Sequence, residues 1–264
     1  MRKVILITGT SSGFGKSIAE KLHSLGHTVI GTSRNADKIN SIFNTKELDI
    51  NNYEMSERLV KSIIKTHGKI DVLINNAGIN ITGPLEIMEI SDIKKVFETN
   101  FFSHLNIIQK VLPHMRHRKS GLIINITSIA GYLGLPFWGA YCASKSSFKL
   151  IAESLNMELK NHNINIVNVA PGDYKTEIAN NRKDIKIDIT SDYYSQYNKV
   201  KKSVNSKMEH GRDPKEVSRL IVKIINNKSP KINYLVGGFL EKRITLKSLF
   251  PDKFFQKIIM KLYN

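Results

Sequence analysis

The sequence of 264 residues predicts an α/β fold in which helices cover both faces of a parallel β-sheet. Short runs rich in β-branched residues alternate along the chain with longer segments of helical periodicity. The strand runs are apolar at most positions, as in IDVLIN at 70–75 and NINIVNVA at 163–170. Strands buried on both faces have this composition, whereas strands of a half-exposed sheet alternate apolar and polar residues.

The first part of the chain alternates between predicted strands and predicted helices. The strands are VILIT at 4–8, HTVIGTS at 27–33, IDVLIN at 70–75, GLIINIT at 121–127 and NINIVNVA at 163–170. The helices run from about Lys16 to Leu25, near 53–67, around 91–115 and around 138–160. The sequence shows no repeat, low-complexity tract or linker between these units, so we expect one domain over residues 1–264.

The pattern becomes irregular after Pro171. Residues 173–212 are polar and show no clear period, and we interpret them as a variable substrate loop, because long loops in compact domains are typically lids or binding loops. A helix then begins with Asp213 as N-cap and Pro214 at its first position. The last predicted strand is KINYLVGG at 231–238, and residues 239–264 form a C-terminal tail.

The composition bears on the cellular compartment of the protein. The single cysteine, Cys142, excludes an internal disulfide and a cysteine metal cluster and fits a reducing cytoplasm, and we expect no metal site. The start MRKVILITG is too short for a signal-peptide core, and no apolar run approaches the ~20 residues of a membrane-spanning helix. We therefore expect a soluble, cytoplasmic protein.

The formal net charge is +17, from 40 Lys plus Arg against 23 Asp plus Glu. Such a charge attracts nucleic acid, anionic lipid or an acidic protein. Lys, Asn and Ile are abundant throughout, so a composition bias of the whole genome is the favoured explanation of the charge. The sequence contains no basic run with interleaved aromatic residues and no nucleic-acid motif, so we expect no nucleic-acid partner.

A glycine-rich turn, TGTSSGFG at 8–15, stands between the first strand and the first helix. Glycine allows a tight turn and a close approach of backbone N–H groups to a pyrophosphate, whose charge then lies at the helix N-terminus. The glycines follow the spacing G-x-x-x-G-x-G. The turn alone is compatible with an ordinary strand-to-helix connection, but its place after the first apolar strand favours a nucleotide.

The end of the second predicted strand bears on the choice of nucleotide. NAD-binding proteins commonly place an acidic residue there to hold the ribose 2′-hydroxyl. This chain has Ser33 and then Arg34, whose guanidinium would meet a 2′-phosphate without a repelling carboxylate. NADP (NADPH) is therefore expected, with NAD less favoured, and the alternative is an arginine that faces solvent.

Several motifs occur together in one order: TGTSSGFG, NNAG at 75–78, Asn100, Ser128, YCASK at 141–145 and PGDYKT at 171–176. In this combination the chain resembles the short-chain dehydrogenase/reductase family from about residue 3 to residue 236. The resemblance implies a single Rossmann-type domain, with a doubly wound parallel sheet of about seven strands, and an oxidoreductase that acts on CH–OH groups with NAD(P).

The resemblance also implies a set of cofactor-binding residues. These are Gly9, Ser11, Ser12, Gly13, Phe14, Gly15, Arg34, Asp49, Ile50, Asn76, Ala77, Gly78, Tyr141, Lys145, Pro171, Gly172, Tyr174 and Thr176. Asp49 and Ile50 would lie at the adenine, and Thr176 and the backbone near Tyr174 would contact the nicotinamide carboxamide. The family usually has a small β-branched residue at position 174, so Tyr174 is a departure.

Tyr141 and Lys145 are four residues apart and share one face of their predicted helix. A free phenol has a pKa of about 10. A cation about 4 Å from the phenolate at an effective dielectric near 20 contributes about 4 kcal/mol, or about three pKa units. We therefore expect Lys145 to bring the pKa of Tyr141 towards neutrality, where an acid or base works best.

The family pattern adds Ser128 and Asn100 to the catalytic set. Ser128 precedes Tyr141 by 13 residues, the interval found in the family, and would hold the substrate oxygen. Thr127 is the alternative for this role, but the interval favours Ser128. Asn100 would anchor a water molecule that links Lys145 to solvent, and Lys145 would also bind the nicotinamide ribose.

The expected reaction interconverts a carbonyl and an alcohol on a small-molecule substrate, with Tyr141 as acid in reduction and base in oxidation. The apolar residues just before Tyr141, from Leu133 to Trp138, suggest the wall of an apolar pocket, although they are equally compatible with core. The tail and the helix near 213–228 resemble members of the family that act on steroids, retinoids or other lipophilic substrates. Two alternatives are a 3-oxoacyl-[acyl-carrier-protein] reductase and a non-catalytic NADP-sensing or interaction protein.

The C-terminal tail has three interpretations. Phe254, Phe255, Ile258, Ile259 and Leu262 fall at helical spacing. The favoured interpretation is a helix that packs on its own domain; the alternatives are packing against another subunit and a weak contact with an anionic membrane surface. We also expect the protein to form a homodimer or homotetramer.

Overall fold

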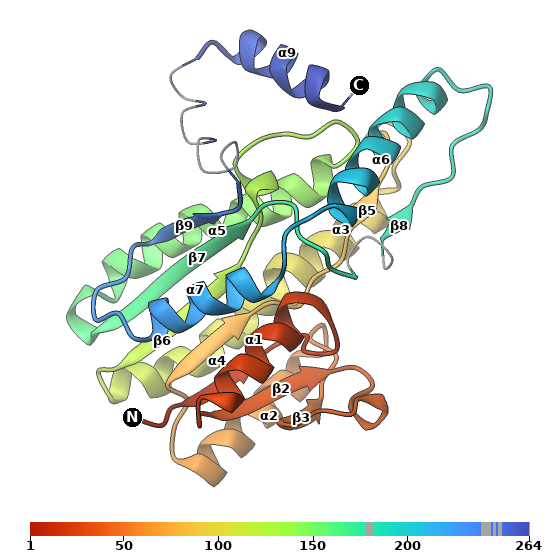
Figure 1. Cartoon of the computed structure of the whole chain (residues 1–264). Coiled ribbons are helices and arrows are strands. Elements are labelled where there is room, and N and C mark those ends of the chain that lie inside the picture. The colour runs from red at the N-terminus through yellow and green to blue at the C-terminus, as the bar shows by residue number, and fades with distance from the viewer. Residues whose placement is uncertain (178–181, 239–243, 245–246, 248–249, 264) are drawn as a thin grey trace.

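The computed structural model describes residues 1–177, 182–238, 244, 247 and 250–263. Within these residues, seven strands form one sheet in the order β3-β2-β1-β4-β6-β7-β9, and every neighbouring pair is parallel (Figure 1). The strands are β1 Val4–Ile7, β2 Thr28–Ser33, β3 Asn44–Glu47, β4 Val72–Asn75, β6 Gly121–Ile126, β7 Ile164–Pro171 and β9 Asn233–Val236. The predicted doubly wound parallel sheet of seven strands is confirmed.

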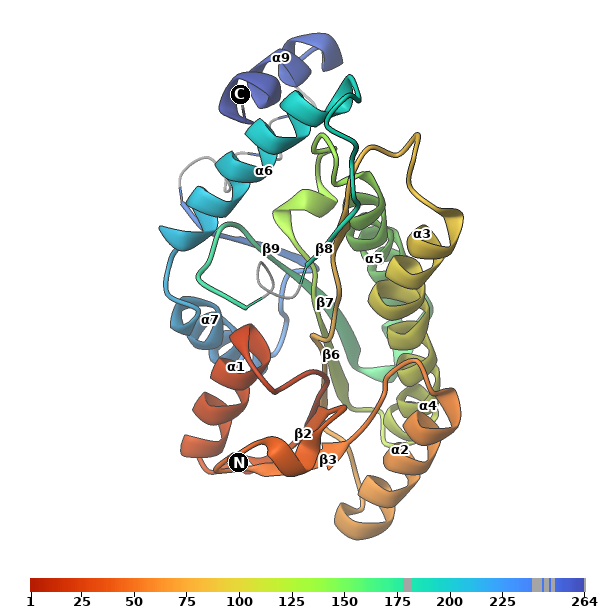
Figure 2. The same cartoon turned by 90° about the vertical axis from the view of Figure 1, so that its right-hand side faces the viewer.

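Helices cover both faces of the sheet (Figure 2). Helices α1 and α7 pack on one face, and α2, α4 and α5 pack on the other. The helices are α1 Gly13–Ser24, α2 Tyr53–His67, α3 Ile90–Phe97, α4 Ser103–His117, α5 Gly139–Glu158, α6 Tyr193–Glu209, α7 Lys215–Ile225 and α9 Asp252–Tyr263. Short 3₁₀ turns span Ala36–Lys38, Ile129–Gly131 and Lys160–His162.

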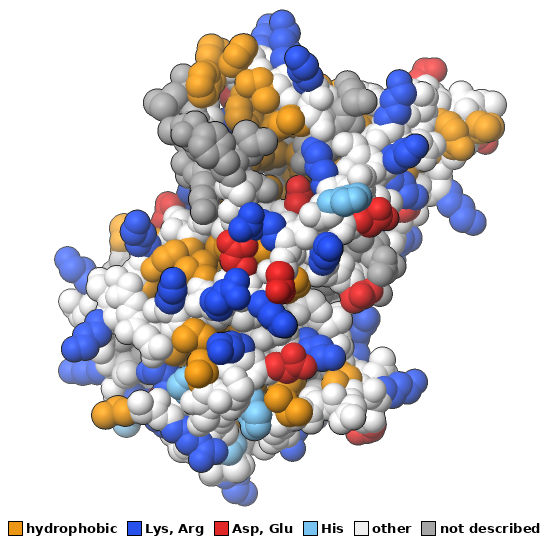
Figure 3. All heavy atoms as spheres, viewed as in Figure 1, with side chains coloured by type: hydrophobic (Ala, Val, Ile, Leu, Met, Phe, Trp, Pro, Cys, Tyr) orange, Lys and Arg blue, Asp and Glu red, His pale blue; other side chains and the backbone are white. Residues whose placement is uncertain are grey.

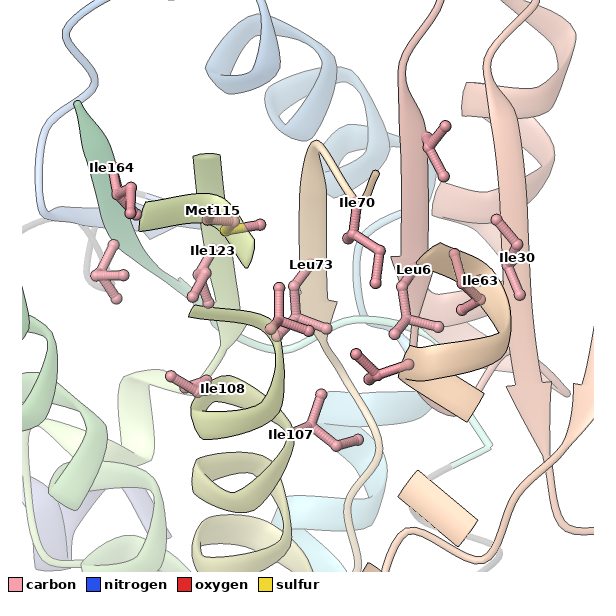
Figure 4. Close-up of a cluster of buried hydrophobic side chains, with 14 of the residues drawn as sticks. Leu6, Ile30, Ile63, Ile70, Leu73, Ile107, Ile108, Met115, Ile123 and Ile164 are labelled. Atoms are coloured by element: carbon pink, nitrogen blue, oxygen red, sulfur yellow. The ribbon is translucent and has the colours of Figure 1, made fainter. Parts of the chain in front are cut away.

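The side chains of β1 explain why both faces need a helical cover. Val4 and Leu6 enter the cluster on the α2, α4 and α5 side, whereas Ile5 and Ile7 enter the cluster on the α1 and α7 side. Successive side chains of a strand point to opposite faces, so a strand that is apolar throughout must be buried twice. Figure 4 shows the first cluster, with Leu6 and Ile107 among the side chains that fill the space between the sheet and the helices.

Strand β3 was not predicted from the sequence. Asn44–Glu47 has polar residues, and three of its four side chains are exposed. It lies at one edge of the sheet and pairs only with β2, where exposed polar side chains are tolerated. A pattern of apolar residues therefore cannot reveal it. The two-residue strands β5 Ile81–Thr82 and β8 Lys183–Asp184, which pair with each other, were also not predicted.

The helix expected around 91–115 is interrupted by a π-helical segment. Helix α3 ends at Phe97, residues Glu98–Phe102 form the π-helix, and α4 begins at Ser103. Such segments are rare and occur frequently at functional sites. Asn100, one of the predicted catalytic residues, lies in the middle of this segment.

The prediction of an irregular loop over residues 173–212 was wrong for its second half. Helix α6 occupies Tyr193–Glu209, and only Tyr197 and Val200 of this helix are buried. Its sequence therefore gives almost no periodic apolar signal. The next helix was placed well: α7 begins at Lys215, whose backbone N–H donates to the side chain of Asp213 at 2.9 Å.

The tail contains α9, which lies beside α6 at one end of the molecule (Figures 1 and 2). The rest of the predicted tail, residues 239–243, 245–246, 248–249 and 264, lies outside the described residues, as do residues 178–181 of the predicted substrate loop. None of the helices in the described part of the chain is long and apolar enough to cross a bilayer.

Candidate active site

A cavity of about 660 Å³ lies at the carboxyl ends of the sheet strands. In open α/β sheets this edge is the usual place for ligand binding. Of the predicted site residues, all except Gly15 and Asn100 line the cavity. The structure thus brings together residues that are up to 167 positions apart in sequence, from Gly9 to Thr176.

The glycine-rich turn forms one wall, and its glycines are required by close contacts. Gly9 and Gly13 have positive φ angles of 71° and 56°, which favour glycine. A Cβ atom at Gly9 would lie 2.9 Å from Cα of Ala77, and one at Gly15 would lie 2.1 Å from the carbonyl oxygen of Gly9. The turn therefore packs directly against Ala77, and Gly15 packs against the backbone of Gly9. Helix α1 begins at Gly13 and directs its N-terminus to the cavity.

Asn76 holds this turn against the end of β4. Its side-chain amide donates to the carbonyl oxygens of Thr8 and Gly9 at 2.9 and 2.8 Å. The next glycine, Gly78, leaves room beside the catalytic helix, because a Cβ there would lie 3.4 Å from Nζ of Lys145. These backbone-level contacts create the cradle that a dinucleotide pyrophosphate needs.

The far end of the cavity carries two cations. Arg34 and Lys38 line it, together with Asp49 and Ile50. Asp49 is exposed, and its carboxylate accepts from the backbone N–H of Asn51 at 3.0 Å. Lys38 was not singled out from the sequence, although it is a basic residue only a few positions beyond the end of β2. The two side chains give this end of the cavity a positive charge, which can pair with an anionic group of a ligand.

Helix α5 places Tyr141 and Lys145 on the cavity wall, and the end of β6 places Ser128 there. The backbone at Ser128 is extended, and its hydroxyl accepts from the N–H of Ala130 at 3.1 Å. The rival, Thr127, also lines the cavity, but its hydroxyl donates to the carbonyl oxygen of Val169 at 3.1 Å. Ser128 is thus the better placed of the two to receive a substrate oxygen.

The sequence predicted a lowered pKa for Tyr141, and this prediction is wrong. Burial raises the pKa of Tyr141 to about 12, and the neighbouring Ser128 hydroxyl opposes this shift only in part. Nζ of Lys145 lies 5.9 Å from the centre of the Tyr141 ring, and burial also lowers the pKa of Lys145 to about 8. Loss of water disfavours both charged forms, so the phenol keeps its proton at neutral pH.

Lys145 on the cavity wall and Asn100 behind it are both held by hydrogen bonds to the backbone. Nζ of Lys145 donates to the carbonyl oxygen of Ile126 at 3.1 Å. The Asn100 side chain accepts from the N–H of Ile79 at 2.8 Å, and it donates to the carbonyl oxygen of Ile79 and to the Ser144 hydroxyl, both at 3.0 Å. Asn100 therefore braces the segment after β4 against α5.

The segment Pro171–Thr176 closes the site on the side of β7. The expected contact was with the backbone near Tyr174, and this residue lines the cavity while its side chain, only 2% exposed, packs in the core. Its ring packs edge-on against Phe14 at 5.4 Å, and its hydroxyl donates to Glu216 at 3.2 Å. Tyr174 thus anchors the segment to α1 and α7. Cys142 is buried, and burial raises the pKa of its thiol to about 11, which agrees with an inert side chain.

Beyond Tyr141 the cavity continues between the start of α5 and helix α6. Its lining there is partly apolar and partly cationic: Leu135, Trp138, Arg182, Val204, Lys207 and Met208. Only Leu135 and Trp138 of these were expected from the sequence. The others come from the segment 173–212, where no periodic pattern marks the residues that face inward.

The chain is similar to several known proteins. The short chain dehydrogenase family model matches residues 3–186. A 3-ketodihydrosphingosine reductase of Bacteroides thetaiotaomicron is 35% identical over 263 residues, covering 99% of this chain and 98% of the relative. An NADPH-dependent 3-dehydrocapnine reductase of Ornithobacterium rhinotracheale is 30% identical, covering 97% of this chain and 95% of the relative.

The architecture also matches a solved structure. The crystal structure of a short-chain dehydrogenase from Streptomyces avermitilis superposes with a TM-score of 0.84 at 26% identity, covering 98% of this chain and 95% of that chain. The family model, the curated relatives and the fold agree with one another. The chain therefore belongs to the short-chain dehydrogenase family and is an oxidoreductase.

Proposed function

We propose that the protein reduces a ketone to an alcohol with NADPH, in a reversible reaction that uses Tyr141 as the proton donor. The observation that carries this proposal is the convergence of Ser128, Tyr141 and Lys145 on one cavity whose other end holds a glycine-rich turn and Arg34. A chain that only senses NADP has no chemical need for the catalytic side of this cavity.

The protonation states suit reduction. The Ser128 hydroxyl holds the substrate oxygen, and Tyr141, which is protonated at neutral pH, transfers its proton to that oxygen as negative charge develops. Lys145, charged below pH 8, stabilises the phenolate that remains. Bound NADPH supplies the hydride that reaches the carbonyl carbon. In the oxidative direction the same phenolate acts as the base.

The preference for NADP over NAD rests on Arg34, with Lys38 as a second cation at the same end of the cavity. No carboxylate follows directly on β2 to bind a ribose 2′-hydroxyl. The similarity to an NADPH-dependent reductase supports the same choice.

The substrate proposed is a lipophilic ketone. Leu135, Trp138, Val204 and Met208 give the substrate end of the cavity an apolar wall, and Trp138 is buried in a cluster with Tyr141. A relative that covers nearly the whole chain is named for reduction of a ketodihydrosphingosine. A 3-oxoacyl reductase is the alternative, and salt-sensitive turnover of a carrier-bound substrate would identify it.

The direct test is a panel of ketones and alcohols of graded chain length, monitored by the absorbance of NADPH. We expect turnover to rise with chain length and to be faster with NADPH than with NADH. Absence of turnover with every member of the panel and both cofactors would refute the proposed function.

We further propose that α9 makes a weak contact with an anionic membrane surface. Phe254, Ile258 and Leu262, spaced by four residues along the helix, are 51%, 39% and 42% exposed, whereas Ile259 on another side is 8% exposed. Figure 3 shows this apolar surface at the top of the molecule, with Lys and Arg side chains beside it. The exposed Lys253, Lys257 and Lys261 form a parallel row.

We also propose an oligomeric state and a cellular compartment, each from a single kind of observation. Leu150 and Met157 on α5 are 69% and 74% exposed, and a homodimer or homotetramer would cover large apolar side chains of this kind. The single cysteine fits a cytoplasmic protein. Measurement of the mass in solution by light scattering tests the first proposal.

A further inference from the structure

Arg182 is a buried cation in the substrate end of the cavity. Only 3% of its side chain is exposed, and the residue lines the cavity together with Tyr141 and Met208. Its guanidinium carbon lies 5.3 Å from the centre of the Trp138 ring, a distance at which the two groups stack favourably. A charged side chain that is buried to this degree needs compensation by an anion.

The carboxylate that contacts Arg182 is shared between two cations. Nε of Arg182 donates to Oδ1 of Asp184 at 2.8 Å, and Nζ of Lys201 lies 2.6 Å from Oδ2 of the same carboxylate. The hydroxyls of Thr82 and Tyr197 also donate to Oδ1, at 2.7 and 3.0 Å. Asp184 is therefore saturated with donors, and its single negative charge faces two positive charges.

The terminal nitrogens of Arg182 remain available. A guanidinium has five N–H groups, and Nε uses one of them. Among the residues that the structure describes, Nη1 and Nη2 of Arg182 have no hydrogen-bond partner. Asp184 and Trp138 thus hold the planar group in place, while its two-pronged end can bind a ligand.

The position of Trp138 connects this group to the reaction centre. Trp138 and Tyr141 belong to one buried cluster at the start of α5, with Leu135 and Val204 at its sides. A ligand that reaches Arg182 while its ketone lies at Tyr141 therefore passes along an apolar wall. Lys207, another cation from α6, also lines this part of the cavity.

We propose that Arg182 forms a subsite for an oxyanion of the substrate, so that the substrate class is a lipophilic ketone that carries a carboxylate, sulfonate or phosphate group. This inference rests on the proposed function for the ketone but not for the anion. A guanidinium recognises such groups through two parallel hydrogen bonds, which gives orientation as well as affinity. Arg182 would then fix the depth at which the ketone meets Ser128 and Tyr141.

A binding experiment tests the anion subsite without turnover. Trp138 is the only tryptophan of the chain, so its fluorescence reports on the group that stacks on it. We expect hexanesulfonate to change the emission in a saturable way, and the neutral hexanol to do so much more weakly. Arg182→Met should abolish the response to hexanesulfonate, and Arg182→Lys should retain part of it.

Lys201→Met is the matched control. It removes a positive charge from the same carboxylate, but Lys201 does not line the cavity among the described residues. A merely structural role of Asp184 and its partners predicts equal effects of the Lys201 and Arg182 substitutions. The subsite predicts that Lys201→Met leaves sulfonate binding intact.

A kinetic experiment tests the use of the subsite in the reaction. A series of ketones with a sulfonate at increasing separation from the carbonyl is compared with the matching neutral methyl sulfones. We expect the wild type to prefer the best sulfonate by about tenfold to a hundredfold in kcat/KM, the contribution of hydrogen bonds to a charged group. Arg182→Met should lower kcat/KM for the sulfonate far more than for the neutral sulfone, whereas Lys201→Met should keep the wild-type preference.

The outcomes separate the two proposals. If ketones are reduced but sulfonates and sulfones are turned over equally by the wild type, the subsite is refuted and the proposed function stands. If hexanesulfonate binds through Arg182 but no ketone in either series is reduced, the reductase proposal fails and the anion site stands. A Trp138 response to hexanol as strong as that to hexanesulfonate also refutes the subsite, and this result needs no variant.

Discussion

Nε2 of His104 lies 3.4 Å from the hydroxyl of Thr8, and the surrounding contacts fix the tautomer of this buried histidine. Its other ring nitrogen, Nδ1, lies 3.2 Å from the carbonyl oxygen of Asn100, which can only accept, so Nδ1 carries the proton. The Thr8 hydroxyl accepts from the backbone N–H groups of Asn76 and Ala77 and donates to Nε2. His104 is therefore a neutral link between the cofactor-binding turn and the π-helical segment.

Replacing His104 by Gln should reduce the sensitivity of the protein to acid. Burial lowers the pKa of His104 from 6.5 to about 3, with the nearby Lys145 charge acting in the same direction. Between these values the unfolded chain binds a proton that the folded protein does not, so stability falls as the pH falls. By linkage, wild type should lose about 2 kcal/mol more than the variant between pH 7 and pH 5. Urea unfolding at both pH values measures this, and equal losses would contradict it.

Tyr141→Phe should abolish turnover, because the substituted ring has no proton to transfer. Binding of NADPH, measured by fluorescence titration, should stay within about twofold, since the glycine-rich turn and Arg34 are untouched. Tyr132→Phe is the control: the Tyr132 hydroxyl has no hydrogen-bond partner among the described residues. Substantial activity in the Tyr141 variant would overturn the proposed mechanism.

The activity should decline in alkali through the titration of Lys145. Burial lowers the pKa of Lys145 to about 8, so the side chain is charged below this pH and loses its charge above it. We expect kcat/KM for NADPH, which reports pKa values of the free enzyme, to fall as the pH rises through about 8. The Lys145→Met variant should be nearly inactive, and its kcat/KM for NADPH should not fall as the pH rises through about 8. Lys149→Met, one turn further along α5, should keep the wild-type profile.

Arg34→Ala should raise KM for NADPH by about tenfold or more and leave KM for NADH nearly unchanged, because a charge-assisted contact with the 2′-phosphate is lost. Initial rates with both cofactors give the two constants. Arg58→Ala on α2 is the control, since Arg58 is exposed and lies outside the cavity lining. An equal change for both cofactors would show that Arg34 does not read the 2′-phosphate.

Vesicle binding should depend on the apolar row and the lysine row of α9. Replacing Phe254, Ile258 and Leu262 together by Ser should abolish co-sedimentation with phosphatidylglycerol vesicles. Replacing Lys253, Lys257 or Lys261 singly by Gln should weaken vesicle binding by about fivefold. Ile42→Ser, at a residue that is 65% exposed elsewhere, is the control. If the Ser variant instead changes the mass in solution while vesicle binding persists, α9 packs against another subunit.

The local order of the fold could be read from the sequence. Helix α2 was predicted at its observed bounds, since the apolar residues of Tyr53–His67 recur with the helical period. The glycine-rich turn was also recognisable, because the residue type itself reflects the contacts of Gly9 and Gly15. Strand β3 and helix α6 could not be found, because exposed elements need no apolar pattern.

The pairing of Tyr141 with Lys145 shows the same division for the site. The residue pattern alone indicates that the two side chains share a helix face and that Ser128 stands at the end of a buried strand. Their protonation depends on the folded protein, because burial raises the pKa of Tyr141 to about 12 and lowers that of Lys145 to about 8. Packing also brought Arg182 against Trp138, 44 positions away. Burial and contacts between distant segments arise only when the whole chain folds, and no local pattern records them.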